Sequence, residues 1–508
     1  MMRKKLAIAM VIANSLVVVL FALYSGAVSV AGNAAMLVCL AVLATDLLYA
    51  VFAKNVVGFW VIPAEAGLFL LSYFARQNAS VTLENVRSVS WLNAAALFAM
   101  PLLATAFLVL DLTGVGRGEI KLPFIARLLK QVLSPVLLVG LFAFALLGYD
   151  HVYNYGNSYH EYTTTRADFL FIAMIFAISC IFLREFIKNR QGEWRDYLRQ
   201  GVSVLVIFAL LSGFGTLCYA RGYFSLKTDV TGAEAEYQAV FGESSKAYGS
   251  DARAVPLSLP NLLFGICHEG DYEVIRDVPY RTIGEGEFAG LHLAYDAFLP
   301  TAPDAHRSAV IMLHGSGGDK TEGNKMHLNK YLASKGYAVY DLQVGDFNEK
   351  NTGYPEDAQR DWDLMLASID AFFAYAARQE SENANFDSTF LIGSSMGGFL
   401  ATDYMYNYEH NYQDNGVDIR GIVPLYGVVS DAEIDKNSVP VLIYIGDHDG
   451  TVSVWDAYEL REKYREAANN NAILLNVSYA GHGCDSHFSS RGAQLELYYL
   501  ERFLGKLR

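Results

Sequence analysis

One stretch of the chain, residues 393–397, has residue types and a spacing suited to nucleophilic catalysis, because it reads Gly-Ser-Ser-Met-Gly. A Gly-x-Ser-x-Gly stretch between a strand and a helix holds its central serine at the tip of a sharp, strained turn. The residues two before and two after that serine come close together, so both must be small. Gly393 and Gly397 satisfy this around Ser395, whereas isoleucine and methionine would occupy the same places around Ser394. The spacing therefore predicts that Ser395 is a nucleophile.

A serine hydroxyl needs a base to take its proton, and His482 is the candidate. The apolar run 472–479 leads into a Gly-His-Gly sequence with His482 at its centre. A glycine on each side permits a tight loop that can carry the imidazole over the serine. His487 is the competing histidine, but its place nearer the last expected helix favours a surface or supporting role. We expect His482 to take the proton and return it to the leaving group.

The acid that would orient this histidine is sought just beyond a strand. The run 441–446 is followed by an Asp-His-Asp sequence that contains Asp447 and Asp449. A carboxylate in such a place can hold the imidazole and stabilise its charged form. Asp447 follows the strand directly, which favours a loop-capping role. We therefore predict Asp449 as the acid.

A glycine-rich loop follows another apolar run, residues 310–314. It reads His-Gly-Ser-Gly-Gly over residues 314–318. Backbone N–H groups in such a loop, together with the N–H of Met396, would stabilise the oxygen anion that forms when Ser395 attacks a carbonyl. The candidate donors are Gly315 or Ser316 and Met396. The alternative is a plain turn.

The elements that must position these residues alternate between strand and helix from about residue 270 onward. Such alternation predicts an α/β fold with a mostly parallel sheet covered on both faces. No helical run separates the first two strands, so an antiparallel start is expected. The expected strands are 272–281, 291–299, 308–314, 337–343, 388–393, 420–426, 440–446 and 472–479, and the expected helices are 324–335, 357–379, 396–408, 455–468 and 489–505.

At these four motifs the chain resembles the α/β-hydrolase superfamily, most closely its esterase, lipase and dienelactone-hydrolase-like members, which neighbour the prolyl-oligopeptidase-type peptidases. The resemblance covers residues 270–508. The sequence contains no metal-ligand spacing, Walker loop or dinucleotide fingerprint, so we expect no cofactor or metal. The resemblance implies a doubly wound α/β-hydrolase sheet. It also implies these roles: Ser395 as nucleophile, His482 as base, Asp449 as acid, and Gly315 or Ser316 with Met396 as the oxyanion hole. Ser316 replaces the middle glycine of the His-Gly-Gly-Gly pattern found in many esterases, which leaves open which amide donates.

Residues 1–220 have the composition of an all-α transmembrane domain, since long apolar runs fill this part of the 508-residue chain. A membrane helix needs about 20 apolar residues. About seven spans are expected, and the span at 57–75 is the weakest because it contains Pro63 and Glu65. The candidates are 6–26, 34–53, 57–75, 91–110, 131–148, 167–183 and 201–220.

The basic residues predict the orientation of these spans. With the N-terminus in the cytoplasm, thirteen Lys and Arg residues fall in inner segments and three in outer loops. This bias follows the positive-inside rule. Seven spans would then place residues 270–508 outside the cytoplasm. Asp46 and Glu65 lie within adjacent spans, and we expect them to be hydrogen-bonded structural groups, with a transport or proton path as the alternative.

Residues 221–269 join the two parts and are expected to be a linker or arm. The stretch 221–253 is polar and small, which is typical of a solvated spacer. The stretch 257–266 is apolar enough to pack on the hydrolase domain or to lie on the membrane. Cys267 and Cys484 could pair outside the cytoplasm, or both could be free buried thiols.

Charge separates the two parts and excludes one class of partner. Residues 1–220 carry a net charge of +5, and the remainder carries −19, for a total of −14. An acidic soluble part argues against nucleic acid as a partner.

The leading hypothesis is an integral membrane serine esterase that uses an acyl-enzyme intermediate, with the lipid bilayer and a small-molecule or lipid ester as partners. The alternatives are a prolyl-oligopeptidase-like peptidase, a membrane acyltransferase, and a transporter or sensor with a degenerate hydrolase module.

Overall fold

The computed structural model contains two compact units. The helical unit is Met1–Phe224 with Leu257–Ile266, and the sheet unit is Ser225–Pro256 with Cys267–Arg508. The structure describes residues 2–508 except 54, 56, 82–85, 116–123, 154–157, 189–193, 250–251, 267–271, 287, 317–319, 321–324, 346–354 and 409–411.

The helical unit consists of long apolar helices, and six of the described helices are long and apolar enough to cross a membrane. The expected weak span falls on α3, whose apolar stretch Trp60–Ala75 is shorter than the other six. Many large apolar side chains of these helices are exposed, such as Leu23, Leu102 and Leu210, as expected of surfaces that face lipid. The helices are α1 (Met2–Tyr24), α2 (Val30–Phe52), α3 (Val57–Val81), α4 (Val86–Thr113), α5 (Phe124–Tyr153), α6 (Ser158–Lys188), α7 (Trp194–Phe241) and the short α8 (Leu259–Phe264).

Buried polar groups in this unit fall into two kinds. Asp111 accepts hydrogen bonds from Arg3, with an Nη2–Oδ1 distance of 2.7 Å, and from the Tyr49 hydroxyl at 2.7 Å. Asp46 and Glu65 are buried as well, but none of their carboxylate oxygens has a hydrogen-bond partner in the part of the chain that the structure describes. Glu65 therefore lacks the expected hydrogen bond in the described structure, whereas the Asn14 side chain interacts with Asp46.

The apolar stretch 257–266 packs against helices of the helical unit. The Asn33 side chain donates to the Leu257 carbonyl at 2.8 Å and accepts from the Leu259 N–H at 2.7 Å. The Phe264 ring meets the edge of the Phe21 ring at a centroid distance of 5.1 Å. The stretch thus belongs to the compact helical unit, which was not one of the two surfaces expected for it.

The sheet unit has the expected α/β architecture. Its eight strands follow the order β1-β2-β4-β3-β5-β6-β7-β8. β2 runs antiparallel to β1 and β4, and the other neighbours are parallel, which confirms the antiparallel start and the mostly parallel sheet. The strands are β1 (Tyr272–Thr282), β2 (His292–Pro300), β3 (Ser308–Leu313), β4 (Ala338–Leu342), β5 (Asn385–Ser394), β6 (Ile419–Leu425), β7 (Val441–Gly446) and β8 (Ala472–Val477).

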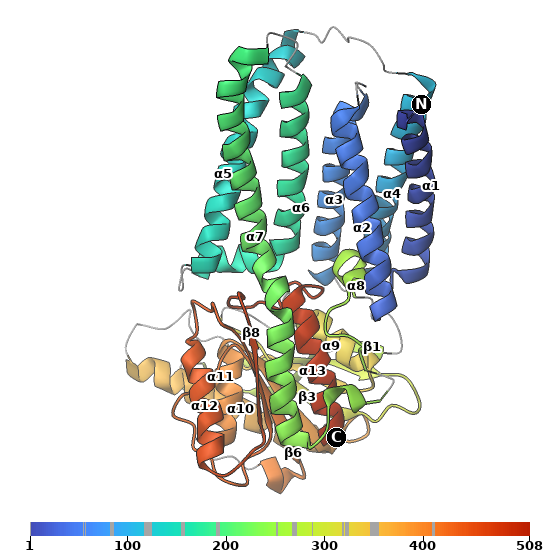
Figure 1. The fold of residues 1–508 in the computed structure, drawn as a ribbon. Coiled ribbons are helices and arrows are strands. Elements are labelled where there is room, and N and C mark those ends of the chain that lie inside the picture. Colours follow the sequence, from blue (N-terminus) through green and yellow to red (C-terminus); the bar gives the residue numbers. More distant parts are fainter. Residues whose placement is uncertain are drawn as a thin grey trace. The chain divides into compact units, whose positions relative to one another are not determined.

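Helices cover both faces of this sheet. Figure 1 shows α10, α11 and α12 on one side of the strands and α9 and α13 on the other. The central strands β3, β4 and β7 are buried along their whole length, as expected of parallel strands covered on both faces. The helices are α9 (Lys325–Ser334), α10 (Pro355–Gln379), α11 (Met396–Tyr406), α12 (Val454–Glu466) and α13 (Arg491–Leu507).

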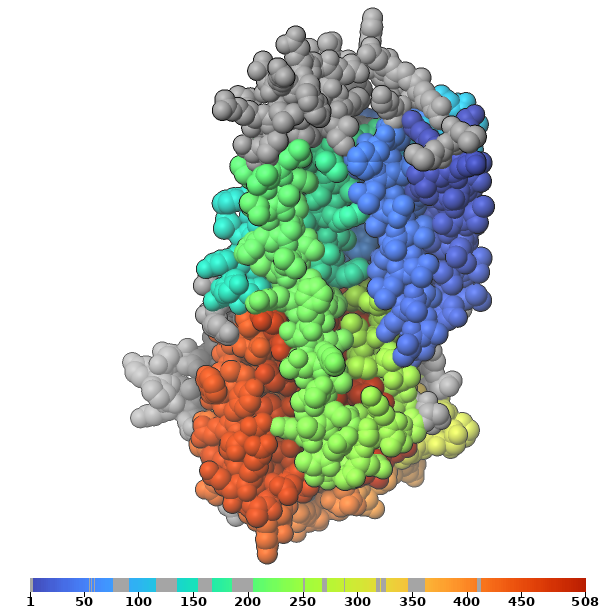
Figure 2. Space-filling model, in the orientation of Figure 1, coloured from blue at the N-terminus to red at the C-terminus, as the bar shows by residue number. Residues whose placement is uncertain are grey.

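The described part of 221–253 is not the solvated spacer that its composition suggests. Helix α7 continues without a break to Phe241, and its last turns pack against the sheet unit. The Tyr237 side chain is fully buried, and the Tyr499 hydroxyl donates to the Val230 carbonyl at 3.1 Å. In Figure 2 this green arm lies against the orange segment that contains α12. The polar residues of the arm contact protein groups that are remote in the sequence, so composition alone could not reveal the packing.

Candidate functional site

Ser395 lies in the sharp turn between β5 and α11. Its φ of 52° and ψ of −117° are unusual for a residue with a side chain, and such strain persists only where the surroundings enforce it. A Cβ on Gly393 would lie 2.0 Å from the Gly397 carbonyl oxygen, and one on Gly397 would lie 2.2 Å from the Leu313 carbonyl oxygen. The Ser395 N–H also donates to the Leu425 carbonyl at 2.9 Å. Both glycines are therefore required for the turn, as the sequence predicts.

The structure brings together the three side chains that sequence analysis selected. His482 Nε2 lies 3.0 Å from Ser395 Oγ, and His482 Nδ1 lies 2.8 Å from Asp449 Oδ2. The carboxylate fixes the proton on Nδ1, which leaves Nε2 as the acceptor for the serine hydroxyl. The three residues follow the ends of β5, β7 and β8, and the carboxyl ends of parallel strands are where α/β sheets place their sites.

Asp449 is held by backbone groups as well as by the histidine. Its side chain is fully buried, and its second oxygen accepts from the N–H groups of Thr451 at 2.9 Å and Val452 at 2.8 Å. These donors hold the carboxylate in one orientation. The His482 side chain is 19% exposed, so the imidazole remains accessible to a substrate.

The two competing residues have other partners. Asp447 Oδ1 accepts from the Tyr479 N–H at 2.6 Å and lies 2.5 Å from His448 Nδ1. His487 is buried, with its Nδ1 at 3.0 Å from the Ser489 hydroxyl. The geometry thus agrees with the choice of Asp449 and His482 over these neighbours.

The expected oxyanion donors lie on two sides of the serine. A Cβ on Gly315 would lie 3.5 Å from Ser395 Cβ, so this loop passes close to the nucleophile. Met396 is the first residue of α11, where an N–H has no acceptor within its own helix. Ser316 is exposed. The remaining glycines of the loop, at 317 and 318, lie outside the described residues.

Tyr426 is a site residue that sequence analysis missed. It follows β6, its ring meets the edge of the His482 ring at a centroid distance of 4.8 Å, and it is buried. Burial and the nearby Asp485 carboxyl, to which its hydroxyl is hydrogen-bonded, raise the pKa of Tyr426 well above its usual value. The Tyr426 hydroxyl therefore stays protonated, and its ring packs against the imidazole of His482. Its position at the end of a parallel strand was the signal that could have revealed it.

Cys484 lies two residues beyond His482 and is a buried free thiol. Its Sγ is 2.9 Å from the Tyr444 hydroxyl, and burial raises the pKa of the thiol above its usual value. It therefore stays protonated and does not compete with Ser395 as a nucleophile. The other cysteine of the expected pair, Cys267, lies outside the described residues.

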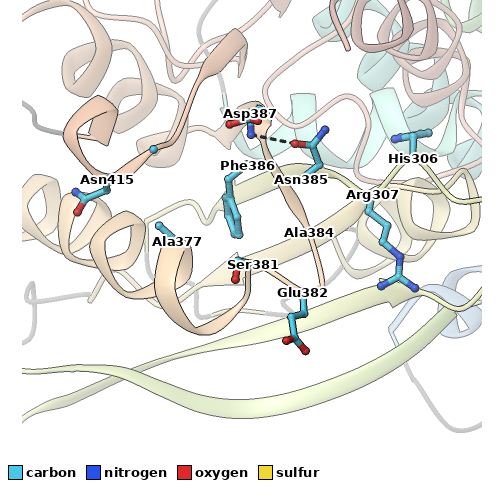
Figure 3. A pocket seen from close by; sticks show the side chains of 11 residues that line it. His306, Arg307, Ala377, Ser381, Glu382, Ala384, Asn385, Phe386, Asp387 and Asn415 are labelled. Carbon is cyan, nitrogen blue, oxygen red and sulfur yellow. Dashed lines mark hydrogen bonds between the residues drawn. The ribbon is translucent and has the colours of Figure 1, made fainter.

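A hollow of about 440 Å³ lies at the opposite end of the sheet (Figure 3). His306, Arg307 and Asn385 line it from the amino-terminal ends of β3 and β5, whereas the triad candidates follow carboxyl ends. Burial lowers the pKa of His306 to about 4, so this histidine is neutral at physiological pH.

Among the residues that the structure describes, no group of three or more His, Cys, Asp or Glu side chains could hold a metal ion.

One family model matches a part of the chain that contains the candidate nucleophile. Residues 304–428 match the family model described as serine aminopeptidase, S33. This match includes Gly315 and Ser395 and ends before Asp449. No curated protein matches the chain.

Several solved structures are similar to about half of the chain. A putative dienelactone hydrolase from Klebsiella pneumoniae subsp. pneumoniae MGH 78578 is 16% identical, covering 46% of this chain and 99% of its own, with a TM-score of 0.35. Esterase B from Lactobacillus rhamnosis HN001 is 14% identical, with coverages of 56% and 96% and a TM-score of 0.36. An esterase from Thermogutta terrifontis is 16% identical, with coverages of 48% and 94% and a TM-score of 0.34.

The geometry predicts different effects at the two competing aspartates. We expect Asp449→Asn to lower kcat by about 10⁴, because an amide would favour the wrong imidazole tautomer. Asp447→Asn should cause a much smaller loss, since that carboxylate holds the Tyr479 N–H and the His448 ring. Steady-state hydrolysis of a p-nitrophenyl ester by the full-length protein in detergent measures both. Equal losses in the two variants would contradict the assignment of Asp449.

Proposed function

We propose that this chain, whose sheet unit is an α/β-hydrolase, is a membrane-anchored serine hydrolase that cleaves carboxylic esters. The observation that carries the proposal is the pair of hydrogen bonds by which His482 joins Asp449 to Ser395. A strained serine with a base at 3.0 Å is arranged for attack on a carbonyl carbon. The family match over residues 304–428 supports a serine hydrolase without separating esters from amides.

The reaction proceeds in two steps. His482 Nε2 takes the hydroxyl proton as Ser395 Oγ attacks the ester carbonyl, and the new oxygen anion receives hydrogen bonds from the N–H of Met396 and that of Gly315 or Ser316. His482 then gives the proton to the leaving alcohol, which departs and leaves an acyl-enzyme. A water molecule, deprotonated by the same imidazole, attacks the acyl group and releases the acid and the free serine. Asp449 stabilises the charged imidazole in both steps.

The connection between β6 and β7 bears on what can cover the site. In many enzymes of this fold a cap domain is inserted between the strands that correspond to β6 and β7. Here that segment is residues 426–440, which contain neither a helix nor a strand. No large cap therefore covers the serine from this connection.

A peptidase is the second candidate, and the description of the matching family as serine aminopeptidase favours it. The same triad would cleave an amide, but the amine is a poorer leaving group and needs the proton from His482 earlier. Parallel assays with a p-nitrophenyl ester and an aminoacyl p-nitroanilide separate the two candidates. Faster turnover of the anilide would favour the peptidase.

The test of the nucleophile uses a fluorophosphonate probe, which reacts when an activated serine displaces fluoride from phosphorus. We expect Ser395→Ala to abolish labelling of the full-length protein in detergent, because the probe then has no activated oxygen. Ser394→Ala is the matched control, since it removes the neighbouring hydroxyl and should leave labelling at the wild-type level. Labelling that survives Ser395→Ala would overturn the proposal.

We further propose that the sheet unit lies outside the cytoplasm. This proposal counts α3 as a crossing and follows from the thirteen-to-three distribution of basic residues. An epitope tag after Arg508 should then bind antibody on intact cells, whereas an N-terminal tag should bind only after the cells are permeabilised. If the C-terminal tag binds only after permeabilisation, the orientation is reversed.

A further inference from the structure

We propose that Asp229, on the arm formed by α7, is a positioning residue that holds the loop carrying His482 in line with Ser395. This inference rests on the proposed function and concerns the geometry of the same site. It depends on residues 225–241 of α7, which belong to the sheet unit, and on residues 478–482, which follow β8.

The arm covers an open edge of the sheet. β8 is the last strand and pairs only with β7, which leaves backbone N–H groups on its other side. The Leu474 N–H donates to Glu236 Oε2 at 2.7 Å, and the Ser478 N–H donates to Asp229 Oδ2 at 3.3 Å. Seven residues advance a helix by about 10 Å, and four advance a strand by about 13 Å, so two carboxylates on one helix face can reach both groups.

Asp229 does more than accept a hydrogen bond from one backbone N–H group beside the sheet edge. Its Oδ1 accepts from the Ser478 hydroxyl at 2.6 Å, and its Oδ2 lies 3.4 Å from Arg491 Nη1. Arg491 in turn donates to the Ser478 carbonyl at 2.8 Å. The side chains of Asp229 and Arg491 are 1% and 4% exposed, so this ion pair is shielded from water. Asp229 therefore fixes the start of the loop through three separate contacts.

The loop needs such support because its backbone is strained. Tyr479 has a φ of 52°, in the left-handed region that residues with a side chain rarely adopt. The Asp447 carboxylate holds the Tyr479 N–H, and the His448 N–H donates to the Ala480 carbonyl at 3.0 Å. Strain of this kind persists only while the surroundings enforce it. Removal of the Asp229 charge weakens a further restraint on this loop, at Ser478, four residues before His482.

The expected consequence is a loss of alignment rather than a loss of binding. A displacement of about 1 Å at a reacting group can cost about 10²-fold in rate. The substrate would still reach Ser395 and the oxyanion donors. A shifted imidazole should therefore lower kcat and leave KM nearly unchanged.

Glu236 provides a matched control on the same helix. It is also a carboxylate that caps a β8 N–H, and it pairs with an arginine, Arg461, at 2.8 Å. Its strand partner Leu474, however, lies eight residues before His482. A merely structural role for the arm would make Asp229 and Glu236 equivalent, whereas a positioning role would separate them.

The experiment compares Asp229→Asn and Glu236→Gln in the full-length protein in detergent. Melting temperature is measured beside kcat and KM for a p-nitrophenyl ester. We expect both variants to lower the melting temperature, but only Asp229→Asn to lower kcat, by about 10- to 100-fold. Equal effects of the two variants on kcat, or a wild-type kcat in Asp229→Asn, would overturn the inference.

Ser478→Ala covers the case in which Asp229→Asn does not fold. It removes one hydrogen bond to Asp229 from the loop side and retains the ion pair with Arg491. We expect a loss in kcat of about fivefold at unchanged KM, and an unchanged kcat would count against the inference. If the wild-type protein shows no esterase activity and no fluorophosphonate labelling, the proposed function fails instead, so the two failures can be told apart.

Discussion

The two hydrogen bonds that join Asp449 to His482 and His482 to Ser395 are the interaction on which the proposed activity depends. The two distances, 2.8 Å and 3.0 Å, join residues that lie 33 and 87 positions apart in the chain. These two bonds form only if three loops end in one place. The parallel strands β5, β7 and β8 provide this, because their carboxyl ends lie at the same edge of the sheet.

Close backbone packing then determines which residues these loops can contain. A Cβ on Gly427 would lie 2.0 Å from the Ser395 carbonyl oxygen, and one on Gly446 would lie 2.1 Å from the Ala480 carbonyl oxygen. Gly427 and Gly446, like Gly393 and Gly397, have no side chain at these close contacts. The ends of the strands can therefore pack against one another. The strained φ angles of Ser395, Tyr426 and Tyr479 occur at the same edge, which places stored strain at the site.

Sequence analysis found the residues whose signals are local. Ser395 and His482 stand between or beside glycines at strand ends, and the strand pattern itself predicted the sheet. Asp229 gave no such signal, because a carboxylate in a polar helix resembles a solvated one until its partner is known. That partner, Arg491, lies 262 residues away. The packing of 257–266 on the helical unit was hidden for the same reason, since an apolar stretch does not specify which apolar surface it covers.

The most direct test of the central claim is the site of covalent modification. The full-length protein is treated with a fluorophosphonate, digested and analysed by mass spectrometry. The account predicts one adduct per chain, on Ser395, and a large loss of that adduct when His482 is replaced by alanine. An adduct on another residue, or an adduct on Ser395 that forms at an unchanged rate without His482, would contradict it.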